Sequence, residues 1–81
     1  MNMSTIQVDV NMDLKGLACP LPVVKVSQQI KKMTVGQILM AETTDPGAHA
    51  DFPAWAKTSG NEIIETEREG NVSKFYIKKL K

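Results

Sequence analysis

The fold is decided by residues 6–33, which read IQVDVNMDLKGLACPLPVVKVSQQIKKM. Apolar and polar side chains alternate strictly over residues 6–13, which predicts a strand with one buried face. Lys15-Gly16 marks a turn, and from Pro20 onward apolar residues recur at steps of three and four. That spacing predicts an amphipathic helix, whose first turn accommodates Pro20 and Pro22. The apolar stripe of the helix consists of Val23, Val26, Ile30 and Met33.

The remaining residues add a second strand, a second helix and a hairpin. Residues 37–43 are apolar in the middle and have the length of a buried strand. A second helical pattern ends at Gly60, a natural C-terminal stop. Residues 61–67 and 72–79 both resemble strands, and the short polar loop at 69–71 between them predicts a β-hairpin.

The start of the second helix depends on Pro53. Ala48 and Phe52 fall at helical spacing after the turn Asp45-Pro46-Gly47. Because a proline in the helix interior would kink it, we expect Pro53 in the first turn, which makes Asp51 a candidate N-cap. Asp45 is the alternative cap of an earlier start.

The predicted order is β-α-β-α-β-β in a single domain over residues 1–81, with residues 1–4 as a flexible N-terminal tail. Two helices cannot cover both faces of a four-stranded sheet. We therefore expect an α/β (α+β) two-layer sandwich: a four-stranded mixed sheet with both helices on one face. The first two strands should be parallel and the last two antiparallel.

Composition excludes several classes of protein. Ten basic and nine acidic residues give a net charge of +1, which disfavours direct binding to nucleic acid. No apolar run is long enough to span a membrane, and the N-terminus lacks signal-peptide features, so we expect a cytoplasmic protein. No apolar stripe is left over once a two-layer core is filled, so we expect a monomer.

Cys19 is the only cysteine of the chain, so an internal disulfide and a cysteine-rich zinc site are both excluded. It precedes a helix that Pro20 starts, and a helix N-terminus stabilises a thiolate over a thiol. The alternative from the local pattern is an inert cysteine packed under the helix. A reactive thiol without a second thiol or a base partner suits a carrier that accepts a group and passes it on.

The chemistry-bearing segment resembles the signature of the TusA/SirA-like sulfur-carrier family. The resemblance rests on Asp13-x-x-Gly16-Leu17-x-Cys19-Pro20-x-Pro22, on Gly36 before the second strand, and on Asp45-Pro46 followed by Asp51-x-Pro53. It extends along the whole domain. With no fused rhodanese or DsrE-like domain in the sequence, the chain is similar to the stand-alone members.

The resemblance implies a sulfurtransferase that carries sulfane sulfur as a persulfide on Cys19, without metal or cofactor. Its expected donor is a cysteine desulfurase or a rhodanese-like protein, and its expected acceptor is a DsrE-like or similar protein. Sulfur oxidation, tRNA thiolation and cofactor synthesis are the possible destinations. The competing hypotheses are a non-enzymatic regulatory or adaptor domain with a structural cysteine, and a redox sensor that forms an intermolecular disulfide.

Six other residues near Cys19 are candidate partner-binding or loop-ordering residues: Asp13, Lys15, Gly16, Pro20, Pro22 and Asp45. Asp13 and Asp45 could control protons and partners, although turn formation and capping are the simpler explanation. Gly16 provides a backbone geometry for the loop. Lys15 could attract an anionic persulfide or a donor protein.

Outside this region, Trp55 fits core packing better than a docking role, and His49 fits a solvated or capping histidine. The basic C-terminal strand is interpreted as solvated edge protection, with a docking surface for an acidic partner as the alternative. Its lysines are Lys74, Lys78, Lys79 and Lys81.

Overall fold

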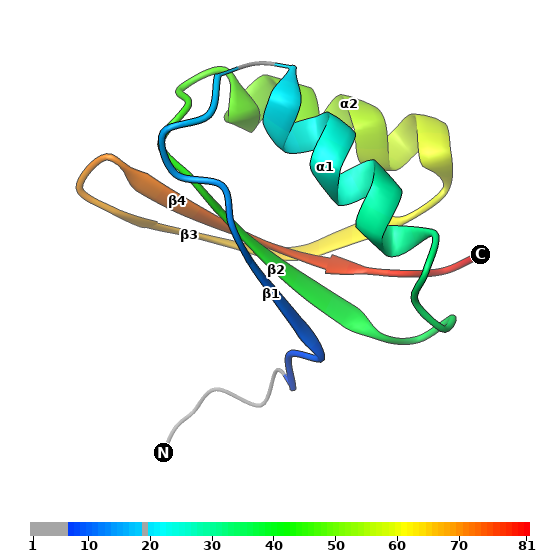
Figure 1. Ribbon diagram of the computed structural model, residues 1–81. Coiled ribbons are helices and arrows are strands. Elements are labelled where there is room, and N and C mark those ends of the chain that lie inside the picture. Colours follow the sequence, from blue (N-terminus) through cyan, green and yellow to red (C-terminus); the bar gives the residue numbers. More distant parts are fainter. Residues whose placement is uncertain (1–6, 19) are drawn as a thin grey trace.

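The computed structural model describes residues 7–18 and 20–81 and has the predicted order of elements. The bounds are β1 Val10–Asp13, α1 Leu21–Ile30, β2 Ile38–Thr43, α2 Ala48–Ser59, β3 Glu62–Glu69 and β4 Val72–Lys78. Both helices lie on the same face of the four-stranded sheet, as Figure 1 shows. The predicted two-layer sandwich is confirmed.

The sheet is mixed, with the strand order β1-β2-β4-β3. β1 and β2 are parallel, as expected for strands joined by a helix, whereas β4 pairs antiparallel with both β2 and β3. A bulge between Ile63 and Glu65 interrupts the pairing of β3 with β4. The parallel pairing brings the end of β1 and the end of β2 to the same edge of the molecule.

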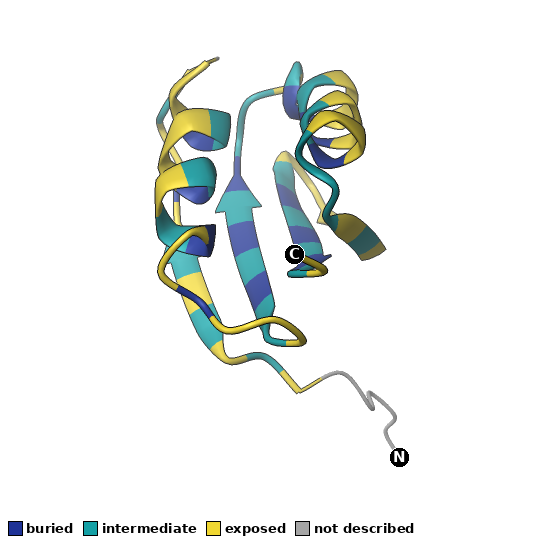
Figure 2. Cartoon of the chain, turned by 90° about the vertical axis from the view of Figure 1, so that its right-hand side faces the viewer, coloured by how far each residue is buried: buried dark blue, intermediate teal, exposed yellow. Residues whose placement is uncertain are grey.

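The core lies between the sheet and the two helices. Along β2 and β4 every second side chain is buried, so these two central strands each present one face to the helices. Phe52 of α2 stacks on Phe75 of β4 with ring centroids 4.8 Å apart, and both side chains are almost fully buried. Figure 2 shows buried residues on the sides of the helices that face the sheet. Trp55 packs edge-on against Phe52, so its assignment to core packing is confirmed.

Helix α1 is shorter than its apolar stripe. The helix ends at Ile30, and Met33 is buried from the following turn rather than from a further helical turn. Pro20 occupies the N-cap position and Pro22 the first turn, as predicted. Met33 therefore falls at helical spacing in the sequence because it is buried, although the helix has already ended.

The expectation that α2 starts close to Pro53 is wrong, and the alternative of an earlier start is confirmed. The helix begins at Ala48, which places Pro53 in its interior, and Asp51 in the first turn rather than at the N-cap. Gly47 is the N-cap residue and no side chain caps the helix; the Asp45 carboxylate instead accepts a bond from the Gly47 N–H at 3.2 Å. Burial of Ala48 against the core favours the early start.

β1 is also shorter than the alternating pattern, because the strand begins at Val10. Asp9 precedes the strand and still contacts β2 at Ile38. The Asp9 N–H donates to the Ile38 carbonyl, and the Asp9 carboxylate accepts from the Ile38 N–H at 2.9 Å. Ile6 and the expected tail at residues 1–4 lie outside the described residues. In the part of the chain that the structure describes, no helix has the length and apolarity needed to cross a membrane.

The interpretation of the C-terminal lysines as edge protection is wrong for Lys74 and Lys78. Both belong to β4, a central strand with a neighbour on each side. They lie opposite Glu67 and Glu62 of β3 in the register of the sheet. Lys74 forms an ion pair with Glu69 of β3 at 3.5 Å, so it contributes a cross-strand pair of opposite charges and does not protect an exposed edge.

Candidate functional site

The candidate site is the loop between β1 and α1, at the end of the sheet where β1 and β2 both terminate. Leu14 anchors the loop: its side chain is buried in the core, and its N–H donates to the Glu42 carbonyl at 2.8 Å. Leu17 packs partly against the same core. The loop is thereby attached to the sheet just before the sequence reaches the cysteine.

Gly16 connects this loop to the chain that follows β2. Its N–H donates to the Thr44 hydroxyl at 3.0 Å, a contact between residues 28 positions apart. Its φ is +85°, a left-handed conformation in which glycine is favoured, and no neighbouring atom would meet an added Cβ. Gly16 is therefore required for backbone geometry and not for close packing, as the sequence suggested.

Cys19 itself lies outside the described residues. Its neighbours Ala18 and Pro20 are both exposed, and the Leu21 N–H donates to the Ala18 carbonyl at 2.9 Å. Pro22 lies in the first turn of α1 and is buried. The Leu21 N–H is already bonded and neither Pro20 nor Pro22 has an N–H, so none of these three residues can donate to an anion. The first turn contains no acidic residue that would oppose a negative charge.

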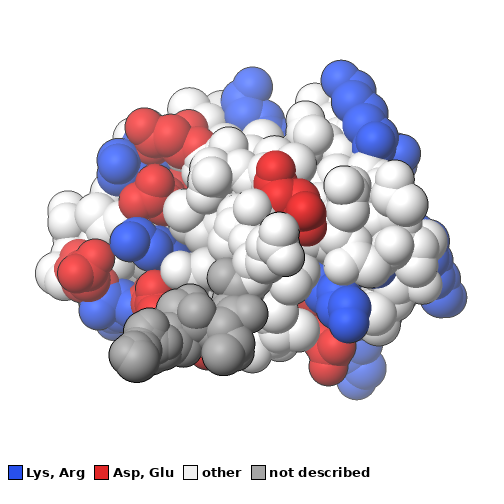
Figure 3. All heavy atoms as spheres, turned by 90° about the horizontal axis from the view of Figure 1, so that it is seen from below, with Lys and Arg blue, Asp and Glu red and all other residues white. Residues whose placement is uncertain are grey.

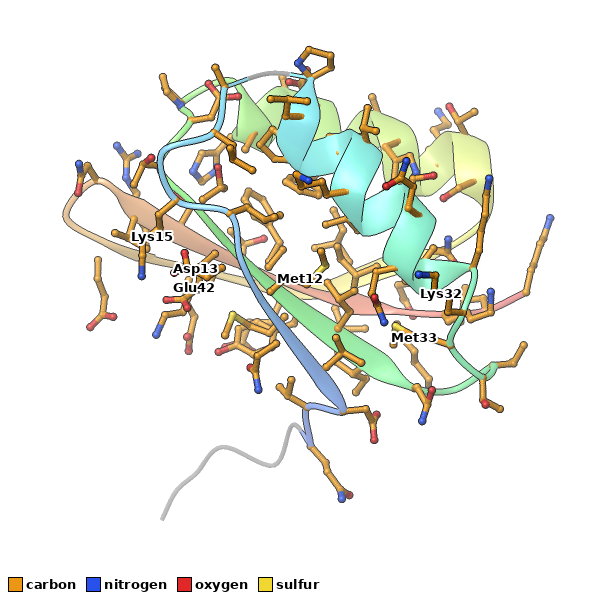
Figure 4. The ribbon with its side chains drawn as sticks, in the orientation of Figure 1. Met12, Asp13, Lys15, Lys32, Met33 and Glu42 are labelled. Carbon is orange, nitrogen blue, oxygen red and sulfur yellow. The ribbon has the colours of Figure 1, made fainter. Side chains whose placement is uncertain are left out.

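Asp13 and Lys15 form a small charged group with Glu42 of β2. The Lys15 ammonium lies 3.7 Å from the Asp13 carboxylate and 4.0 Å from that of Glu42, and the Lys15 N–H donates to Asp13 at 3.1 Å. Figure 4 shows the three side chains close together and directed away from the helices. Asp13 thus orders the turn, as predicted, while the role of Lys15 in attracting a persulfide stays a prediction.

Exposed apolar side chains continue from the loop along α1. Leu21 and Val24 are 47% and 41% exposed, although both are large aliphatic residues. With Ala18 and Pro20 they form an apolar surface next to the position of Cys19. Such a surface is typical of a site that another protein covers for part of the time.

A polar pocket of about 230 Å³ lies beside the loop, between the start of α2 and the β3–β4 hairpin. A 2.7 Å hydrogen bond joins His49 Nε2 and the Ser73 hydroxyl, and the His49 ring lies against Phe75 with ring centroids 5.2 Å apart. His49 is exposed, as expected of a solvated histidine, and its ring is also held by Ser73 and Phe75 of β4. The polar lining consists of Thr44, Asp45, His49, Arg68, Asn71 and Ser73.

Asp13, Lys15, Gly16 and Asp45 were predicted to lie near Cys19, and the structure places all four at one end of the sheet. Thr44 was not predicted, because only the parallel pairing of β1 and β2 brings this residue to Gly16. Among the described residues, no cluster of three histidine, cysteine, aspartate or glutamate side chains could hold a metal ion.

Comparisons with known proteins decide the family. The sequence profile described as "Sulfurtransferase TusA" matches residues 11–79, which is most of the chain. The chain belongs to the TusA sulfurtransferase family. The predicted family is confirmed.

Individual relatives of the family support this assignment. The "Sulfur carrier protein TusA" of Allochromatium vinosum is 44% identical over 88% of this chain and 93% of its own length. The protein of the same name from Pseudomonas aeruginosa strain LESB58 is 31% identical over 93% of this chain and 95% of its own. A longer protein of Aquifex aeolicus is 46% identical, but this chain spans only 39% of it, and 37% of a similar relative from Bacillus subtilis.

A solved structure supports the fold. The crystal structure of a SirA-like protein from Desulfitobacterium hafniense superimposes with a TM-score of 0.77 and covers 89% of this chain and 99% of the other. The two sequences are only 18% identical. This similarity concerns the fold alone.

Proposed function

We propose that this chain accepts sulfane sulfur as a persulfide on Cys19 and transfers it to an acceptor protein. The observation that supports the proposal most directly is the position of Cys19 in a TusA-family chain. It lies between exposed Ala18 and Pro20, on a loop that Leu14 and Gly16 attach to the sheet. An attached loop with an exposed tip suits a thiol that meets a donor and an acceptor in turn.

The transfer requires only thiol chemistry. The Cys19 thiolate attacks the terminal sulfur of the donor persulfide, the sulfur–sulfur bond of the donor breaks, and the donor leaves as a thiolate. The acceptor thiolate then repeats the step on the Cys19 persulfide, which returns Cys19 to a thiolate. Sulfur atoms and electrons balance in both directions, and the chain acts stoichiometrically in the relay.

We further propose a cysteine desulfurase or rhodanese-like protein as the donor and a DsrE-like or similar protein as the acceptor. The apolar surface formed by Ala18, Pro20, Leu21 and Val24 supports contact with such proteins. Sulfur oxidation, tRNA thiolation and cofactor synthesis remain the candidate destinations. Transfer assays with one acceptor from each pathway would distinguish them.

Intact-mass spectrometry tests the proposal. Incubation with glutathione persulfide should add one sulfur, about 32 Da, to the wild-type chain and nothing to Cys19→Ser. Far-ultraviolet circular dichroism of both proteins shows that they are folded. A folded wild-type chain whose mass stays unchanged with several persulfide donors would contradict the proposal. In that case slow alkylation of the native thiol would favour the adaptor with a structural cysteine.

A further inference from the structure

The face of the sheet opposite the helices is not covered by any helix or strand among residues 7–18 and 20–81. Along β2 and β4, the residues that alternate with the core residues are only partly buried. At the centre of this open face Met40 lies opposite Tyr76, and Ile38 lies beside them on β2. A single-sided antiparallel sheet commonly has a solvated outer face, so its exposure alone indicates nothing.

The open face has a net negative charge, whereas the rest of the chain has a net positive charge. Among the described residues, six carboxylates and three lysines belong to this face, whereas the rest of the chain has three carboxylates and seven basic residues. A chain with a net charge of +1 is thus divided into an acidic face and a basic remainder. The acidic residues of the face are Asp13, Glu42, Glu62, Glu65, Glu67 and Glu69; the basic ones are Lys15, Lys74 and Lys78.

The carboxylates surround the apolar centre. The Tyr76 hydroxyl donates to Glu67 at 2.9 Å, and Glu65 lies opposite Tyr76 in the register of β3 and β4. Burial raises the pKa of Tyr76 to about 12, together with the hydrogen bond to Glu67 and the charges of Glu67, Glu65 and Glu42. The lysines offset only part of this charge, since Lys74 pairs with Glu69 at 3.5 Å and Lys15 is shared between two carboxylates. Figure 3, a view onto this face, shows acidic side chains gathered toward the hairpin with lysines between them.

We propose that the open face of the sheet is a docking surface for a protein partner that presents basic and apolar side chains. The acidic border would attract such a partner, and the centre formed by Ile38, Met40 and Tyr76 would pack against its apolar side chains. Asp13 and Lys15 belong both to this face and to the loop that leads to Cys19. A partner seated here therefore borders the loop without covering Leu21 and Val24.

A role of this docking in sulfur exchange rests on the proposed function, whereas the docking itself does not. The test therefore uses Cys19→Ser, which cannot carry sulfur. The probe is a synthetic ten-residue peptide that alternates lysine with leucine, compared with the same peptide carrying glutamate in place of lysine. Amide shifts in ¹⁵N-labelled protein should change along β2 and β4 with the lysine peptide only, and the affinity should fall as salt is raised.

Two variants of equal net charge sharpen the test. Glu65→Gln with Glu67→Gln removes two carboxylates from the open face and should weaken peptide binding by about tenfold. Gln28→Lys with Ala54→Lys raises the net charge by the same amount at exposed positions on the helices and should leave the affinity within about twofold. Thermal unfolding shows that both variants are folded.

Four results would overturn the inference, and the first three concern the peptide. They are equal binding of the glutamate peptide, amide shifts centred on the helices, and equal loss of affinity in the two variants. Shifts of the same open-face amides with protein concentration alone would assign the face to a second copy of this chain, which also overturns it. Because Cys19 is absent throughout, each of these results leaves the persulfide experiment unaffected.

Discussion

Replacing Gly16 by alanine should separate the loop's contribution to function from its contribution to stability. Gly16 has a φ of +85°, and Gly36, near the start of β2, has a φ of +97°; no atom lies within 4 Å of a Cβ added at either position. Both substitutions therefore introduce backbone strain without a steric clash. Gly36 lies in the connection between α1 and β2, so Gly36→Ala is a matched control.

The expected loss follows from two opposing terms. A left-handed conformation costs an alanine about 1–2 kcal/mol relative to glycine. Alanine has less conformational freedom than glycine in the unfolded chain, which offsets about 0.4–1 kcal/mol of this loss of stability. Each variant should thus lose about 1 kcal/mol of unfolding free energy, which corresponds to a decrease in Tm of about 4–8 °C for a domain of this size.

The two variants should differ in sulfur loading. Strain at residue 16 disturbs the Gly16–Thr44 bond and the loop that carries Cys19, whereas strain at residue 36 does not reach this end of the sheet. Thermal unfolding and the rate of persulfide formation by mass spectrometry measure the two effects. An unchanged Tm in Gly16→Ala, or an equal change of loading rate in both variants, would refute this reasoning.

Three further predictions concern the sheet. Phe75→Ala should cost about 3–5 kcal/mol, because it removes a buried ring that stacks on Phe52, and urea unfolding should show it. Tyr76 has a pKa of about 12 in the folded chain, so it stays neutral between pH 10 and 12 while the unfolded chain loses that proton. Its contribution to stability is therefore lost as the pH rises through this range. Tyrosinate absorbance of the wild type and of Glu67→Gln, in which this pKa should be lower, checks the assignment. Thr44→Val should lower the unfolding free energy by about 1 kcal/mol through loss of the Gly16 hydrogen bond, and Thr44→Ser should restore most of it in the same unfolding assay.

The order of elements could be predicted because each element has a clear hydrophobic period and most are separated by turn residues. The position of a strand within the sheet could not, because alternation reports burial but not neighbours. β4 follows β3 in sequence yet lies between β2 and β3, and for this reason Lys74 and Lys78 were wrongly assigned to an edge. The separation of charge between the acidic open face and the basic rest of the chain depends on the same strand order, so it could not be predicted from the sequence either.

Local rules failed at the start of α2, where tertiary packing competes with them. Pro53 suits a first turn, but burial of Ala48 and Phe52 against the core extends the helix toward its N-terminus. The part of the candidate site formed by residues close in sequence, such as Asp13, Lys15 and Gly16, could be predicted. The contribution of Thr44 requires the register of β1 and β2, which short-range patterns do not contain.

The attachment of the Cys19 loop to β2 also has a consequence for how the chain folds. The bonds of Leu14 to Glu42 and of Gly16 to Thr44 each close a segment of 28 residues that contains all of α1. Contacts of such sequence separation carry a large entropic cost of loop closure, so local helices and the β3–β4 hairpin can form first. A chain that is still being synthesised, or that has partly unfolded, then lacks the two bonds that attach this loop to the sheet. Under the function proposed above, the rate of sulfur loading would then report completed folding.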